Sequence, residues 1–114
     1  MRSKLVTVVE IKAFSAAAKG RMKQEEVEAL IDVLADDPES GDVIRETGGL
    51  RKLRFAVSGK GKSGSVRVVY YFYNDTMPVF LLTVFAKNER DNLSKAERNT
   101  LAKLARALRD SYGD

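Results

Sequence analysis

Four basic residues are spaced so that they could meet on one side of a β-sheet. Lys52 and Arg54 are two positions apart in a strand-like run, so their side chains project from the same face. Arg67 lies in the next strand-like run, within cross-strand reach of that pair, and Lys87 ends the run after it. If these three strands are neighbours, the four cations converge on a patch that suits one or two phosphate groups.

Such a cluster suits the cleavage of RNA by its own 2′-hydroxyl group. The nucleophile is part of the substrate, so the protein must align it with the leaving 5′-oxygen, stabilise the phosphorane and move protons. Arginine fits the stabilising role because its planar fork matches phosphate and stays protonated. A lysine crowded by other cations can act as a base or as an acid. We therefore take all four cations as candidate catalytic residues.

The sequence contains no cysteine and no histidine. Most metal chemistry is thereby excluded, and we expect neither a metal nor a cofactor. Acid–base chemistry must then use Lys, Arg, Asp, Glu or Tyr. A domain without disulfides suits the reducing cytoplasm, where we expect this protein. We expect no membrane partner, because no segment reads as a signal peptide or approaches the roughly 20 apolar residues needed to span a bilayer.

The net charge of +4 is distributed unevenly along the chain. The segment from Glu25 to Asp42 contains eight acidic residues and no basic one, whereas the segment from Arg51 to Arg67 contains six basic residues and no acidic one. This asymmetry indicates a polyanionic partner, although two solvated faces of opposite sign would give the same pattern. Beside the four cations, we predict these RNA contacts: Arg51, Lys60, Lys62, Asn88 and Tyr71.

Several of these features also have a purely structural interpretation. Lys52 and Arg54 could be solvated strand charges, but Arg67 in an apolar strand is harder to explain because an uncompensated buried charge is costly. The aromatic run from Tyr70 to Tyr73 could stack on unpaired bases, although such runs more often pack within a sheet. The loop from Ser58 to Gly64 lacks the spacing of a nucleotide-binding loop, so it either grips an RNA backbone or is a plain turn.

The elements that position these residues indicate one α+β domain over residues 1–114. Runs of β-branched and apolar residues predict strands over 5–11, 50–57, 65–73 and 79–86. Helical periodicity and a capping box formed by Ser94 and Glu97 predict helices over 24–35 and from 94 onward, with a short helical segment over 15–20. We expect a curved, mostly antiparallel sheet, with its last three strands in a meander and the helices packed on one face.

The motifs also resemble a known family. In this order along the chain, they are Asp37 to Ile44, Gly48 to Arg54, Gly59 to Gly64, Arg67 to Tyr71, Lys87 to Glu89 and Asn92 to Ser94. Together they resemble the RelE/HigB toxins of bacterial type II toxin–antitoxin modules, over nearly the whole chain. The resemblance implies a microbial RNase-type fold. It also implies an endoribonuclease that cleaves mRNA in the ribosomal A site without a metal, leaves a 2′,3′-cyclic phosphate and inhibits translation.

The resemblance further implies partners. These are a cognate antitoxin with a helix-turn-helix DNA-binding part, the 30S A site with its mRNA, and operator DNA reached only through the antitoxin. Two alternatives remain open. A ParE-like toxin of the same fold inhibits DNA gyrase and does no RNA chemistry, and an inactivated relic binds RNA without cleaving it. The concentrated basic cluster favours the nuclease.

The family pattern assigns roles to particular positions. Lys52 and Arg54 match the basic pair on the second strand of RelE-like toxins, Arg67 matches an arginine of the third strand, and Lys87 matches the basic end of the fourth. RelE-type enzymes often carry a catalytic tyrosine shortly after that end, and this sequence has none there, like the HigB-like branch. Proton transfer then falls to lysine, or to Tyr112 if the C-terminus returns to the site.

Overall fold

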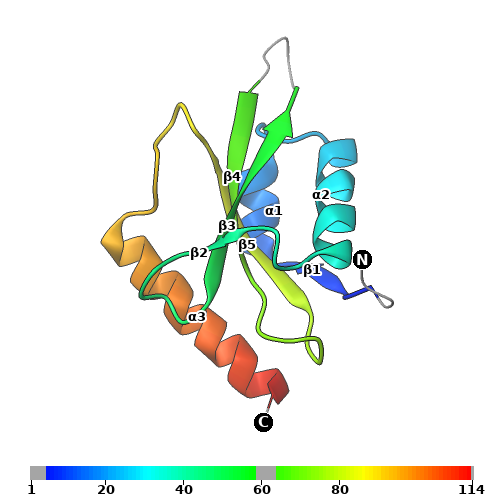
Figure 1. The fold of residues 1–114 in the computed structure, drawn as a ribbon. Coiled ribbons are helices and arrows are strands. Elements are labelled where there is room, and N and C mark those ends of the chain that lie inside the picture. Colours follow the sequence, from blue (N-terminus) through cyan, green and yellow to red (C-terminus); the bar gives the residue numbers. More distant parts are fainter. Residues whose placement is uncertain (1–4, 59–63, 114) are drawn as a thin grey trace.

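The structure, a computed structural model, describes residues 5–58 and 64–113 and arranges them as a sheet with helices on both sides (Figure 1). The elements in chain order are β1 (Val8–Glu10), α1 (Lys12–Ala18), α2 (Gln24–Asp36), β2 (Asp42–Val43), β3 (Leu50–Val57), β4 (Gly64–Tyr71), β5 (Val79–Ala86) and α3 (Lys95–Gly113). The strand order in the sheet is β1-β5-β4-β3-β2. β1 pairs parallel with β5, and the other neighbours are antiparallel.

The predicted α+β class and the meander of β3, β4 and β5 are confirmed. β3 and β5 have the predicted bounds, and α3 begins with the predicted capping box: the Glu97 N–H donates to Ser94 Oγ and the Ser94 N–H donates to Glu97 Oε1. The first strand is shorter than expected. β2 was not predicted, because its two exposed residues show no apolar alternation that could indicate a strand.

One face of the sheet is covered by α1 and α2. Phe14 of α1 and Leu30 and Leu34 of α2 are fully buried against Val68 and Tyr70 of β4, in a cluster that also includes residues of β3 and β5. The apolar residues of α2 recur at helical spacing, so one stripe of the helix faces the sheet and its acidic residues face solvent. This layer is the main hydrophobic core.

The expectation that the helices pack on one face holds for α1 and α2 but not for α3. The last helix lies across the opposite face, where Ala105 packs with Leu50, Tyr71 and Phe80 (Figure 1). The physical reason is that β4 and β5 are apolar on both faces, so the second face also needs a cover. This second core covers the part of the sheet near Leu50. Beyond the helix, the same face of the sheet continues toward the end of β3 and the start of β4.

The connector between α2 and β3 is held by a buried tyrosine. The Tyr70 hydroxyl accepts a hydrogen bond from the Gly41 N–H and donates one to the carbonyl oxygen of Pro38, each at 2.8 Å. A Cβ at Gly41 would lie 2.8 Å from that hydroxyl and 2.9 Å from the carbonyl oxygen of Lys52, so glycine is required by the close approach. Burial raises the pKa of Tyr70, which keeps the hydroxyl protonated as a donor.

In the part of the chain that the structure describes, no helix has the length and apolar character to span a bilayer.

We predict that Tyr70→Phe lowers the free energy of unfolding by about 1–3 kcal/mol, because the Gly41 N–H and the Pro38 carbonyl lose a buried partner. Urea denaturation measures the loss. Tyr73→Phe is the matched control, since Tyr73 is 49% exposed, and it should change stability by no more than about 0.5 kcal/mol. Equal midpoints for the two variants would contradict the anchoring role of Tyr70.

Candidate functional site

Two arginines face each other across paired strands at the open end of the second sheet face. In the register of β3 and β4, Arg54 lies directly opposite Arg67. Arg54 Nε donates to Ser65 Oγ at 3.3 Å, and Arg67 Nη1 donates to the same oxygen at 2.8 Å. The predicted convergence of these arginines is therefore present, and Ser65, which sequence analysis did not assign to the site, joins them.

The electrostatics of this pair indicate an anionic ligand. Like charges directly opposite each other weaken a strand pair. Among the residues that the structure describes, neither guanidinium of Arg54 or Arg67 lies within ion-pair distance of a carboxylate. Arg67 is half-buried, so water screens its charge incompletely. A bound phosphate would supply the missing negative charge and would match the planar forks of both arginines.

Lys52 lies two residues from Arg54 on the same strand face and is held by a residue from the segment before α3. Its Nζ donates to Asn92 Oδ1 at 2.7 Å. Asn92 was part of a family motif in the sequence, but no role was predicted for it. The hydrogen bond restricts the long side chain of Lys52, so its amine stays on the open face beside the arginines.

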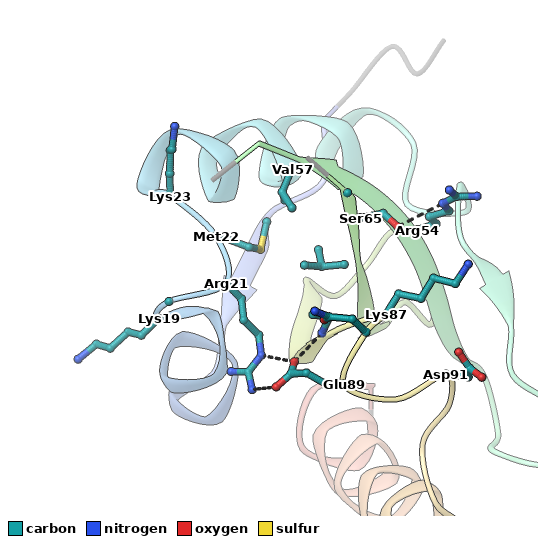
Figure 2. Close-up of a pocket in the computed structure, with 15 residues that line it drawn as sticks. Lys19, Arg21, Met22, Lys23, Arg54, Val57, Ser65, Lys87, Glu89 and Asp91 are labelled. Carbon is teal, nitrogen blue, oxygen red and sulfur yellow. Dashed lines mark hydrogen bonds and ion pairs between the residues drawn. The ribbon is translucent and has the colours of Figure 1, made fainter. Parts of the chain in front are cut away.

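Lys87 and Asn88 follow β5 at the edge of the same region. Ala86, the last residue of β5, pairs with Val66, so the chain leaves the sheet opposite Ser65. Lys87 and Asn88 are exposed and line an open pocket of about 1110 Å³, which Arg54 and Ser65 also line (Figure 2). Lys52 and Arg67 do not line this pocket. Of the four predicted catalytic cations, Lys52 and Arg67 therefore lie on the sheet face, Lys87 lies at the pocket, and Arg54 belongs to both.

An ion pair fixes the loop that carries Lys87. Arg21 Nε and Nη2 donate to the two carboxylate oxygens of Glu89, both at 2.7 Å, and Arg21 Nη1 donates to the carbonyl oxygen of Ala17 at 2.7 Å. Glu89 Oε1 also accepts a hydrogen bond from the Ala86 N–H at 2.8 Å. The hydrogen bonds from Arg21 and from the Ala86 N–H lower the pKa of Glu89 to about 2. The loop after β5 is thus tied to the segment between α1 and α2.

Two residues that were predicted to contact RNA lie away from the open cationic face. Arg51 alternates to the opposite face of β3 from Lys52, and its Nη1 donates to the carbonyl oxygens of Glu39 at 3.2 Å and Gly41 at 2.8 Å, so it supports the connector. Tyr71 is 1% exposed because its ring packs beneath α3, so it has no free surface on which a base could stack. The other two predicted contacts in the loop, Lys60 and Lys62, lie outside the described residues.

Tyr112 does not reach the cluster. Its ring packs edge-on against Phe80, with ring centroids 5.5 Å apart. Phe80 lies near the start of β5, whereas Phe85 near its end is the residue that pairs with Arg67. Five residues of extended strand separate the two positions by roughly 17 Å. The possibility that Tyr112 serves proton transfer in this conformation is therefore excluded.

No group of three or more Asp or Glu residues placed to hold a metal ion occurs within residues 5–58 and 64–113.

Fold and site together define a small α+β protein with an open cationic site on one face of its sheet. A family model described as the RelE toxin of the RelE/RelB toxin–antitoxin system matches residues 6–112, and the chain belongs to that RelE toxin family. A solved structure of E. coli toxin RelE, a double arginine-to-alanine variant in the free state, shares the fold with a TM-score of 0.52 at 15% sequence identity. The match covers 90% of this chain and 97% of that chain. Membership implies a cognate antitoxin as a partner, and the predicted family is confirmed.

We predict that Glu89→Gln is less stable than the wild-type protein at neutral pH but not near pH 2. The pKa of Glu89 in the fold is about 2, below its ordinary value of 4.5. A carboxylate with a lowered pKa stabilises the fold above its unfolded pKa, and that contribution disappears as the pH falls through the folded value. Urea denaturation over this range measures the difference. Asp32→Asn, at an exposed position of α2, serves as control, and a Glu89→Gln deficit that persists near pH 2 would contradict the assignment.

We predict that Arg54→Gln leaves the fold as stable as the wild type or raises its stability by about 0.2–1 kcal/mol, because it removes one of two opposed charges. Thermal or urea unfolding tests this expectation. Arg106→Gln, at an exposed position of α3, is the control for loss of one positive charge and should have little effect. A clear loss of stability in Arg54→Gln alone would show that Arg54 supports the fold, which would remove the argument for an anionic ligand.

Proposed function

We propose that this toxin is a ribosome-dependent endoribonuclease that cleaves mRNA in the 30S A site, by attack of the RNA 2′-hydroxyl on the adjacent phosphate. The observation that supports the proposal is the opposed pair Arg54 and Arg67, joined by Ser65 on an open sheet face. Two guanidinium forks with no carboxylate partner among the described residues form a receptor for a phosphate.

The cleavage chemistry uses groups that this chain supplies. The 2′-oxygen attacks phosphorus and loses its proton to a base, the bond from phosphorus to the 5′-oxygen breaks, and an acid protonates that oxygen. The products are a 2′,3′-cyclic phosphate and a free 5′-hydroxyl. Arg54 and Arg67 stabilise the phosphorane, whose negative charge exceeds that of the ground state. No protein nucleophile takes part, because the attacking oxygen belongs to the substrate.

Lys52 and Lys87 are the two amines proposed for proton transfer. Lys52 stands beside Arg54 on β3, held by Asn92, and Lys87 stands at the end of β5 across the arginine pair. A phosphate between the arginines would therefore have one amine on each side, as the in-line arrangement of attacking and leaving oxygens requires. The assignment of base and acid between the two lysines stays open. The proposal includes neither a metal nor another cofactor.

The proposed partners follow from this activity. The toxin would act in the cytoplasm, where ribosomes and mRNA meet. A cognate antitoxin would neutralise it, and a helix-turn-helix part of that antitoxin would carry the toxin to operator DNA. Toxin and operator DNA would then have no direct contact.

Two parallel reactions test the proposal. Purified toxin is added to ribosomes programmed with mRNA, and cleavage is read by primer extension; the same preparation is added to a DNA gyrase supercoiling reaction. We expect cleavage within the A-site codon and normal supercoiling. Intact mRNA with blocked supercoiling would support a ParE-like gyrase inhibitor instead. Intact mRNA with normal supercoiling would support a relic that lacks catalysis.

We predict that Lys52→Ala and Arg67→Ala each lose most toxicity while staying folded. Each substitution removes a contact worth about 3 kcal/mol in the transition state, which corresponds to roughly a hundredfold in the cleavage rate. Single-turnover cleavage on the ribosome measures the effect, and circular dichroism checks the fold. Lys103→Ala, exposed on α3, should retain full activity. Full growth arrest by both site variants at matched expression would refute the assignment.

A further inference from the structure

The pocket beside the arginine pair extends the phosphate site toward the other layer of the protein. The pocket opens where β4 extends beyond the end of β5. The pairing of these two strands begins at Val66, so Gly64 and Ser65 have no β5 neighbour. Arg54, Ser65 and Lys87 form the wall that the pocket shares with the phosphate site (Figure 2). A ligand whose phosphate lies at the arginines can therefore extend into the pocket without leaving the protein surface.

The far wall of the pocket is the segment Lys19–Lys23 between α1 and α2. This wall has a fixed distance from the loop after β5, because Arg21 bridges to Glu89 through two hydrogen bonds. The opposite charges of Arg21 and Glu89 offset each other, so the bridge shapes the pocket without adding net charge. The pocket is thus a built feature that joins both layers.

The lining of the pocket suits a nucleobase better than a second phosphate. Met22, Val57 and Val66 give it an apolar inner surface, and Met22 and Val57 face the space between the walls (Figure 2). Lys19 and Lys23 point outward from the far wall, so their charges lie at the outer rim (Figure 2). Apolar surface suits the flat faces of a base, and an amide suits its edge because it offers both a donor and an acceptor. Asn88 supplies that amide in the lining.

The volume also agrees with such a ligand. Small-ligand pockets measure roughly 300–1,000 Å³, and this open pocket of about 1110 Å³ has room for a nucleoside together with solvent. We propose that the pocket binds the base of the nucleotide next to the scissile phosphate, with Met22 and Val57 against its face and Asn88 hydrogen-bonded to its edge. This inference rests on the proposed function, and it makes Asn88 a specificity-determining residue.

The first test measures base preference next to the cut. Programmed ribosomes carry mRNAs that differ in the nucleotide on either side of the scissile phosphate, including an abasic ribose at each position. We expect the wild-type rate to fall about tenfold with the abasic ribose at one of the two positions, and to vary with the base there. In Asn88→Ala that variation should flatten. Asn99→Ala, an exposed asparagine of α3, should keep the wild-type pattern.

The second test locates the base and does not require cleavage. An mRNA with a 2′-O-methyl group at the cut and 4-thiouridine beside it is photocrosslinked to the toxin on the ribosome. Digestion after glutamate releases residues 11–25, which contain the far wall of the pocket. We expect the crosslink in that peptide at Met22.

The outcomes separate this inference from the proposed function. Cleavage by the wild type with no base dependence, and no crosslink in residues 11–25, would overturn the base pocket and leave the nuclease intact. A crosslink in residues 11–25 together with no cleavage of the unmodified mRNAs of the first test would support the pocket and refute the nuclease. If Asn88→Ala cleaves with unchanged preference but escapes neutralisation by the antitoxin, the pocket is an antitoxin site and the inference is wrong.

Discussion

The pairing register between β3 and β4 sets the position of the candidate site, because it places Arg54 opposite Arg67 and lets Ser65 reach both. A slip of one residue would turn Lys52 and Arg54 toward the core under α1 and α2, where a charge is costly. The fully buried apolar residues on both faces of β4 oppose such a slip. The hydrogen bonds of Tyr70 to Pro38 and Gly41 hold the connector before β2 against β4. The core and the site therefore depend on the same register.

The sheet face that carries α3 has an apolar half and a cationic half, and the helix covers only the apolar one. The helix buries the apolar half of that face near Leu50 and Phe80, and the half beyond it carries the cations. A helix on the cationic half would bury charges without partners, which the apolar stripe of α3 cannot offset. The site is therefore open because of its own charge, and the segment before α3 contributes Asn92 to it as the chain crosses from one half to the other.

Much of this arrangement could be predicted from local patterns, and the failures have physical causes. Strand alternation and the meander order were enough to bring Lys52, Arg54 and Arg67 together. Arg51 was counted by its charge, although alternation alone sends it to the other face of β3 from Lys52. The burial of Tyr71 could not be predicted, because the location of α3, which covers it, depends on long-range packing. The partners Arg21 and Glu89 lie 68 residues apart, and no periodicity connects them.

The opposed arginines have a consequence for how such a toxin is lost over generations. Mutations in a protein core usually abolish activity and folding together, so the damaged product is removed by cellular proteases. If the pair Arg54 and Arg67 binds the scissile phosphate as proposed, the two properties are separate there, since the proposed chemistry uses both charges and the sheet would be relaxed by removing either. A single substitution at either arginine would therefore give a harmless allele whose product still folds and persists in the cell. A silenced copy of this gene would keep its shape, and with it the surfaces that its antitoxin recognises.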